Sequence, residues 1–338
     1  MKICIVGAGA IGGFIGTKLA KTGAHEVSAL ARGDTLAALE QYGWRLSTNS
    51  GLVQAPLHMA SSDAAELGEQ DLIIIAVKSQ SLEQVVPTLA PLIGKRTLIL
   101  PAMNGVPWWF MKNVQVGGLQ ASWNKPLQSI DPAGHIQRAL PERQVIGCVV
   151  HASTSVESPG LARHHGGQKL IVGEPNGEAD GSSSARVSAL VQALSDAGFE
   201  AVHSKDIRHN IWYKLWGNMT MNPVSAITGA TIDRVLGDKL VRGFCSSVML
   251  EAQAIGARIG CKIDESPEDR HAVTAKLGAF KTSMLQDVEA GRAIELDAIV
   301  GAVREIGQRL EMHTPNIDAL LGLTRLLGQS KNIYKIEK

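Results

Sequence analysis

The hydrophobic pattern of the first two hundred residues alternates between strand-like and helix-like periods. Six short apolar runs are typical of strands, at residues 3–6, 26–31, 72–77, 97–101, 145–151 and 169–172. The third run (LIIIAV) is apolar on both faces, as expected of a parallel strand covered by helices on either side. Amphipathic stretches at 11–21 and 185–198 predict helices. This alternation predicts a doubly wound, Rossmann-like α/β fold.

The pattern changes near residue 207, beyond which only helical periods occur. They cover residues 208–222, 233–260, 266–289, 294–311 and 315–328. A Gly- and Ser-rich segment, 176–184, and one more helix precede the change. We therefore expect two domains, a Rossmann-type domain over residues 1–205 and an all-helical domain over residues 206–338.

Composition and charge mainly exclude functions. The 338 residues carry a formal net charge of +1, which gives no reason to expect nucleic acid or an acidic membrane as a partner. Four scattered cysteines and ten histidines form no zinc-ligand spacing, so we expect no metal site. The chain shows neither a signal-peptide pattern nor an apolar run of about 18 residues, so we expect a cytoplasmic protein.

A glycine-rich turn follows the first predicted strand directly. Gly7-Ala8-Gly9-Ala10-Ile11-Gly12 fits G-x-G-x-x-G and opens an amphipathic helix, which is the context in which this motif binds a dinucleotide. The first glycine allows a tight turn, the second lets the backbone approach a pyrophosphate, and the third lets helix and strand pack closely. The alternative is a purely structural turn.

The end of the second strand indicates which dinucleotide is bound. NAD-preferring sites carry Asp or Glu there, whereas this strand ends at Arg32, whose guanidinium can bind the 2′-phosphate of NADP. Asp34 argues against this unless it pairs with Arg32 or caps the next helix. Lys78 and Asn104 end the next two strands, at the sheet edge where ligands bind. A solvated lysine and an Asn-Gly turn are the alternatives for those two.

One helical stretch of the second domain carries polar groups on an apolar background. Lys214, Asn218 and Asn222 stand at i, i+4 and i+8, which keeps them within about 80° of one helix face. Burying a lysine and two amides is costly without partners, so the face either binds a polar ligand or faces water.

Taken together, these motifs resemble the ketopantoate reductase (2-dehydropantoate 2-reductase) family over nearly the whole chain. The glycine motif, the strand-end lysine and Asn104-Gly105 are followed by K-x-x-x-N-x-x-x-N-P at 214–223. Ser283-Met284-Leu285-Gln286-Asp287 and then Glu295-Leu296-Asp297 are similar to the S-M-x-Q-D and E-x-D signatures of that family, with Glu295 expected to begin a helix.

The resemblance implies an NADPH-dependent reduction of ketopantoate to pantoate, a step of pantothenate biosynthesis. Lys214 would be the general acid that protonates the carbonyl oxygen as hydride arrives from the nicotinamide, and Glu295 would orient it. The implied substrate-binding residues are Asn104, Asn218, Asn222 and Ser283. The implied cofactor-binding residues are Gly7, Ala8, Gly9, Ala10, Ile11, Gly12, Arg32, Lys78, Asn104 and Ser153. A homodimer is left open.

Two departures from the family pattern concern the substrate. The stretch after Asn104 is longer and contains Trp108 and Trp109, which either line the substrate pocket or pack a domain interface. Ile232 stands where some members carry a polar residue, so the site lacks one donor. Reduction of a different 2-oxoacid therefore remains the first alternative. A non-catalytic NADPH-binding sensor is the second.

Overall fold

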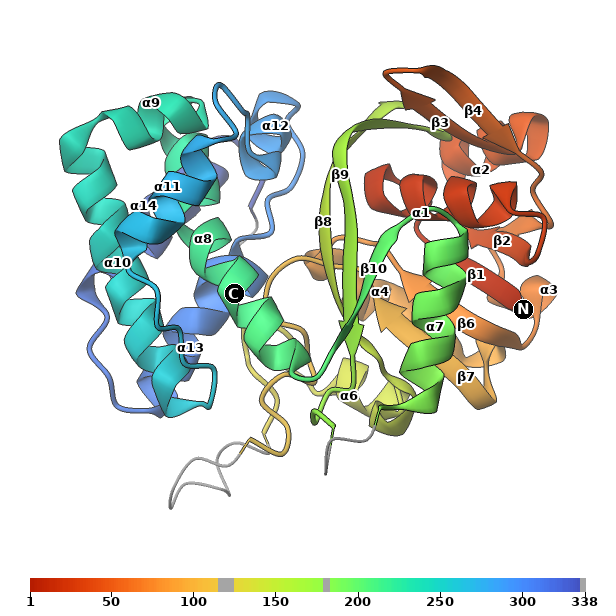
Figure 1. Ribbon diagram of the computed structural model, residues 1–338, viewed down its shortest axis with the longest axis horizontal. Helices are drawn as coiled ribbons and strands as arrows, with labels where there is room; N and C mark the ends of the chain where they lie inside the picture. Colours follow the sequence, from red (N-terminus) through yellow and green to blue (C-terminus); the bar gives the residue numbers. More distant parts are fainter. Residues whose placement is uncertain (115–124, 179–182, 335–338) are drawn as a thin grey trace. The chain divides into compact units, whose positions relative to one another are not determined.

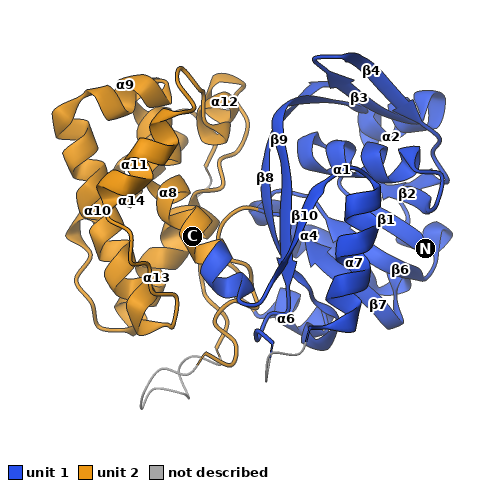
Figure 2. Ribbon diagram, in the orientation of Figure 1, with its two compact units in different colours: residues 1–103, 134–210 blue, residues 104–133, 211–338 orange. Residues whose placement is uncertain are grey.

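The computed structural model describes residues 1–114, 125–178 and 183–334 (Figure 1). It divides into two compact units (Figure 2). Unit 1 contains residues 1–103 and 134–210, and unit 2 contains residues 104–133 and 211–338. The structure confirms the predicted fold class, a Rossmann-like parallel-sheet part followed by a helical part.

Unit 1 is built on a five-stranded parallel sheet in the order β5-β2-β1-β6-β7. Its strands are β1 (Lys2–Val6), β2 (Glu26–Leu30), β5 (Ala60–Ser61), β6 (Gln70–Ile75) and β7 (Ile93–Pro101). The aliphatic side chains of β1 and β6 are almost completely buried, in agreement with the two-sided apolar pattern of the third predicted strand. The carboxyl ends of β1, β2 and β6 lead into the glycine motif, Arg32 and Lys78.

A second sheet covers the helix that follows β1. Its strands are β10 (Glu200–Ser204), β9 (Leu161–Gly173), β3 (Trp44–Thr48) and β4 (Gly51–Ala55) in that order, with β8 (Gly147–Ser158) antiparallel to β9. Residues 147–151 and 169–172 of the predicted strands belong to this sheet, whereas Val145 forms an isolated parallel bridge to Ile99 of β7. This sheet packs closely on α1 (Ala10–Lys21) because the helix carries glycines on the facing side. A Cβ on Gly16 would lie 2.6 Å from the Trp44 ring.

The remaining helices of unit 1 are short, apart from two of ten and twelve residues. They are α2 (Gly33–Tyr42), α3 (Ala64–Leu67), α4 (Ser79–Val85), α6 (His135–Ala139) and α7 (Ala185–Asp196), with 3₁₀ turns η1 (Val86–Thr88), η2 (Ala90–Leu92) and η3 (Glu142–Gln144). Buried residues of both sheets, α1 and α7 form one continuous hydrophobic core.

Unit 2 is helical in the residues that the structure describes. Its elements are α8 (Ile207–Thr228, entering from unit 1), α9 (Ile232–Gly237), α10 (Lys239–Arg258), α11 (Pro267–Ala275), α12 (Ser283–Glu289), the π-helical turn η5 (Asp297–Gly301), α13 (Ala302–Arg309) and α14 (Pro315–Ser330). Two predicted helices are divided by capped breaks. Asp238 accepts from the N–H groups of Leu240 and Val241 at the start of α10, and Thr282 caps α12.

The described residues 104–114 and 125–133, predicted to be part of the first domain, belong instead to unit 2. The carboxylate of Glu305 on α13 accepts from the N–H groups of Gln128 and Ser129 at 2.8 Å each. Arg309, one turn later, donates to the carbonyls of Lys125 and Pro126. None of the described helices is long and apolar enough to cross a membrane.

Candidate functional site

The glycine turn of unit 1 has the shape that the motif requires. Gly7 has φ +88°, a backbone conformation that residues with a side chain rarely adopt. A Cβ on Gly12 would lie 2.0 Å from the carbonyl oxygen of Gly7, so helix and strand could not approach as closely with any other residue. By contrast, nothing lies within 4 Å of a Cβ placed on Gly9. The middle glycine therefore borders open space.

The first turn of α1 offers donors to an anion. Gly9 is the N-cap residue and no side chain caps the helix, so the first N–H groups have no side-chain acceptor. The first turn carries no acidic residue, and Ala10 and Ile11 are half-buried beside the opening. Free donors at the positive end of a helix dipole, with room beside Gly9, fit the pyrophosphate of a dinucleotide.

Arg32 is the N-cap residue of α2 and its side chain is exposed. It makes no ion pair within the described ranges, and no side chain caps α2, so Asp34 neither pairs with Arg32 nor caps the helix, the two alternatives considered for it. Lys78 is half-buried at the N-cap of α4, three residues after the end of β6. Ser153 lies on β8 opposite Gly166, where the register of β8 with β9 is irregular.

Helix α8 carries the polar face of unit 2. The ammonium of Lys214 donates to Oδ1 of Asn104 at 2.9 Å. One and two turns later come Asn218, which is half-buried, and Asn222, which is 6% exposed. Neither side-chain amide has a hydrogen-bond partner among residues 1–114, 125–178 and 183–334. Neither amide is among the fully enclosed polar groups that lack a partner, so both amides reach solvent and are available to bind a polar ligand.

Asn104 reaches Lys214 through a turn that is attached to η5. The N–H group of Val106 donates to the carbonyl of Ala298 at 2.8 Å. Gly105, which lies between Asn104 and Val106 in the sequence, has φ +83°. π-Helical turns are frequent at functional sites, and neither this one nor its bond to Val106 was foreseen from the sequence. A helical period alone does not distinguish a π turn from an α turn.

Ser283 and Glu295 also lie in unit 2. Ser283 is the exposed first residue of α12, and its hydroxyl has no hydrogen-bond partner in the part of the chain that the structure describes. Glu295 is half-buried and directly precedes the helical run that begins at residue 296 and continues through η5, so the helix begins one residue after the predicted position. The structure thus joins Lys214 to Asn104 directly and places Glu295 and the other implied substrate-binding residues in the same unit.

The tryptophans after Asn104 are buried. Trp109 is 1% exposed and packs near Phe110, whose ring stacks on Trp212 of α8 with centroids 5.9 Å apart. These aromatics therefore extend the core around α8. Ile232 is 1% exposed at the start of α9 and likewise belongs to the core.

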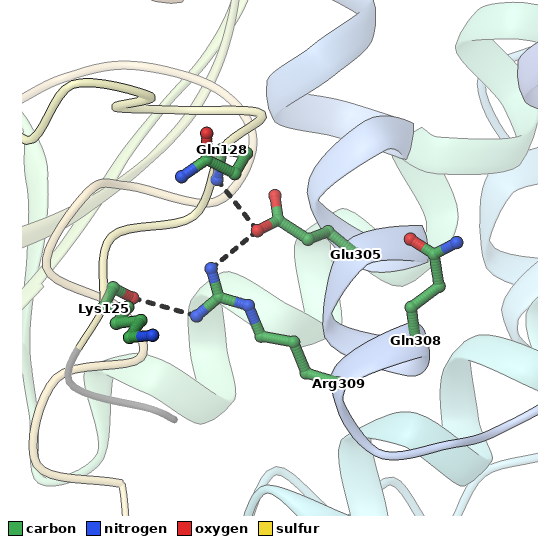
Figure 3. Close-up of a pocket in the computed structure, with 5 residues that line it drawn as sticks. All are labelled: Lys125, Gln128, Glu305, Gln308 and Arg309. Carbon is green, nitrogen blue, oxygen red and sulfur yellow. Dashed lines mark hydrogen bonds and ion pairs between the residues drawn. The ribbon is translucent and has the colours of Figure 1, made fainter. Parts of the chain in front are cut away.

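A separate open pocket of about 410 Å³ lies where residues 125–128 meet α13 (Figure 3). It is lined by Lys125, Gln128, Glu305, Gln308 and Arg309, none of which was implied by the sequence. Among the described residues, no three His, Cys, Asp or Glu side chains are grouped closely enough to hold a metal ion.

Comparison with known proteins agrees with this geometry. The model of the family described as ketopantoate reductase PanE/ApbA matches residues 3–109, and the model of its C-terminal region matches residues 206–328. A 2-dehydropantoate 2-reductase of Mesorhizobium japonicum is 41% identical over 334 residues, which cover 99% of this chain and 100% of that protein.

Two solved structures are also closely similar. A protein of Ralstonia solanacearum MolK2, provisionally assigned as a ketopantoate reductase, is 50% identical with a TM-score of 0.91, covering 98% of this chain and 99% of its own. A D-mandelate dehydrogenase in complex with NADH and anilino(oxo)acetate has a TM-score of 0.82, covering 99% of this chain and all of its own. At 23% identity, the second likeness concerns the fold alone.

These comparisons show that the protein is a nicotinamide-dependent oxidoreductase. More specifically, the chain belongs to the ketopantoate reductase family, whose members act on CH–OH groups.

Proposed function

We propose that this chain reduces ketopantoate to pantoate with NADPH, as a step of pantothenate biosynthesis, and that Lys214 is the general acid. The observation that carries the proposal is the face of α8, where the Lys214 ammonium is held by Asn104 at 2.9 Å and two amides without partners follow it. The 41% identity to a 2-dehydropantoate 2-reductase supports the choice of substrate.

The residues of unit 2 match the needs of 2-oxoacid reduction. As the carbonyl carbon is reduced, negative charge develops on its oxygen, and the Lys214 ammonium donates the proton that neutralises it. The carboxamide oxygen of Asn104 accepts a hydrogen bond from this ammonium and so fixes its direction. Asn218, Asn222 and Ser283 supply donors for the substrate carboxylate and hydroxyl groups, because none of them is engaged elsewhere in the described chain.

The residues of unit 1 hold the cofactor in this proposal. The first turn of α1 binds the pyrophosphate, the exposed Arg32 binds the 2′-phosphate, and Lys78 and Ser153 contact the rest of the nucleotide. NADPH supplies the hydride when it is bound. The choice of NADPH over NADH depends on Arg32, since no acidic residue stands at the end of β2 to accept from a ribose 2′-hydroxyl.

The test is a spectrophotometric scan at 340 nm with NADPH or NADH and a panel of 2-oxoacids that includes ketopantoate. Rapid oxidation of NADPH with ketopantoate is the expected result. Turnover with other members alone would contradict the substrate and leave the reaction class standing. If NADPH binds but no member turns over, the protein is a sensor and not a reductase.

A further inference from the structure

The turn that carries Asn104 is attached to η5 more tightly than any other amino acid at position 105 would allow. A Cβ on Gly105 would lie 2.4 Å from the carbonyl oxygen of Ala298 and 2.6 Å from its carbonyl carbon. The φ of +83° at Gly105 disfavours a side chain independently. The next N–H group, that of Val106, donates to the same oxygen at 2.8 Å.

This attachment connects two parts of the proposed catalytic site. Asn104 is one residue before Gly105 and accepts from the Lys214 ammonium. Glu295, which the family resemblance implies orients the same lysine, lies three residues before Ala298 on the chain that enters η5. A shift of Gly105 relative to Ala298 would therefore change the position of Asn104 relative to both Lys214 and the η5 turn.

We infer that Gly105 is a positioning residue that directs the Asn104 carboxamide towards Lys214. It does so because its backbone packs directly against the Ala298 carbonyl of the π-helical turn. Gly105 contacts neither substrate nor cofactor in this role and acts only through Asn104. The inference rests on the proposed function only for the statement that Lys214 is the proton donor. The positioning itself is a property of unit 2 and can be measured without turnover.

The chain offers a matched control for the substitution G105A. Gly260, also in unit 2, has φ +84°, and nothing lies within 4 Å of a Cβ placed on it. G260A therefore introduces the same backbone strain without the collision. Any difference between G105A and G260A reports the contact with Ala298 and not the left-handed backbone alone.

The first measurement is the rate at which Lys214 of the purified protein is acetylated by an amine-reactive ester, followed by peptide mass mapping. A charge-assisted hydrogen bond restrains an ammonium, so G105A and N104A should each label Lys214 roughly three- to tenfold faster than wild type, and G260A should match wild type. Labelling of G105A at the wild-type rate would overturn the inference, whatever reaction the protein catalyses.

The second measurement is a double-mutant cycle on kcat with NADPH and the best 2-oxoacid. G105A should lower kcat by about 10²-fold, as expected for a misplaced catalytic group, with the Kd for NADPH within about twofold of wild type. If Gly105 acts through Asn104, the double variant G105A/N104A should be no slower than N104A. Additive losses would mean that Gly105 has a merely structural role.

The labelling experiment still tests the role of Gly105 if the protein has no reductase activity or if G105A does not fold. If the wild-type protein reduces no 2-oxoacid, the proposed function fails, while the acetylation rates still decide whether Gly105 positions the lysine. If G105A does not fold, V106P deletes the N–H group that bonds to Ala298 without adding a Cβ at position 105. Faster labelling of Lys214 in V106P supports the inference and unchanged labelling contradicts it.

Discussion

At the scale of single residues, the side chain of Arg32 bears most directly on the choice of cofactor. It is exposed, it lies at the end of β2, and it forms no ion pair among the described residues. Replacing it with Asp removes a donor for the 2′-phosphate and adds an acceptor for a ribose 2′-hydroxyl. We expect R32D to weaken NADPH binding by about 10- to 100-fold while NADH binding improves.

The measurement for R32D is a fluorescence titration with both nucleotides. R96D changes another exposed arginine of unit 1, on β7, and should leave both affinities unchanged. An unaltered preference for NADPH in R32D would place the phosphate contact on another residue.

Lys214 is the residue on which the proposed chemistry depends. Without its ammonium the developing alkoxide has no proton donor, so K214A should lower kcat by about 10²–10⁴-fold. The Kd for NADPH should not change, because the glycine turn lies in unit 1. K276A, at an exposed lysine of unit 2, is the control, and steady-state kinetics at 340 nm is the measurement. A kcat of K214A equal to that of wild type would remove Lys214 from the mechanism.

Residue types and spacing were enough to predict which side chains of α8 share one face. They could not predict the bond between Lys214 and Asn104, because 110 residues separate the two and no local pattern encodes so distant a contact. The close contact between Gly105 and the Ala298 carbonyl was not predicted, for the same reason. An Asn-Gly pair is a common turn, and the sequence does not reveal that a carbonyl of η5 occupies the space of its missing side chain.

At the scale of elements, the glycines within α1 serve packing, whereas the N-cap glycine that precedes it borders open space. A Cβ on Gly16 would lie 2.6 Å from the buried Trp44 ring, whereas one on Gly9 would meet nothing within 4 Å. G16A should therefore cost about 1–3 kcal/mol of unfolding free energy through overpacking. G9A should leave stability unchanged and weaken NADPH binding, because its methyl group would occupy the space proposed for the pyrophosphate.

Thermal melting and NADPH titration of the two variants provide the measurement, and each variant is the control for the other. G16A should lower Tm by several degrees, and G9A should lower only the affinity for the dinucleotide. A G9A variant that binds NADPH like wild type would argue against the proposed pyrophosphate site at α1.

The sequence predicted the parallel strands better than the second sheet. Strands buried on both faces, such as β6, are continuous aliphatic runs and are easily recognised. β3 and β4 bury only Trp44, Leu46 and Ala55, and β9, which pairs with β3, lies more than a hundred residues away in the sequence. The helix breaks at Asp238 and Thr282 were missed because the apolar period continues across them while a capping side chain ends the hydrogen-bond ladder.

At the scale of the whole molecule, a buried histidine should make stability depend on pH. His271 is 1% exposed and lies 3.0 Å from the hydroxyl of Ser246. Desolvation by burial lowers the pKa of His271, although the charge of Glu268 acts in the opposite direction. As pH falls below the unfolded-state value of about 6.5, the unfolded chain therefore binds a proton that the folded chain does not.

Stability should accordingly decrease as the pH falls from about 7 towards 5, by at most about 1.4 kcal/mol per pH unit for this one group. Urea unfolding of wild type and H271Q across this range isolates the effect, since other groups titrate equally in both proteins. Parallel pH profiles for the two proteins would show that His271 contributes nothing to the dependence.

The chain leaves unit 1 after residue 103 and returns at residue 134, and the described residues 125–133 are held by contacts within unit 2. Glu305 provides them by accepting from the N–H groups of Gln128 and Ser129 and from the Ser129 hydroxyl. Hydrogen bonds to a carboxylate are worth about 1.5–3 kcal/mol each, and removing the charge should loosen this end of the segment. In E305Q, we expect both amides to exchange with deuterium at least about tenfold faster than in wild type.

The same substitution also tests whether the two ends of the segment are coupled. Asn104 lies at its start, and Ser129 approaches Gly301 at the end of the η5 turn that also receives Val106. If the π turn links these contacts, E305Q should lower kcat moderately while leaving the Kd for NADPH unchanged. E311Q, at an exposed position just beyond α13, should change neither exchange nor kcat. Faster amide exchange in E305Q with a wild-type kcat would mean that Glu305 holds residues 125–133 alone, and that the turn carrying Asn104 keeps its place without them.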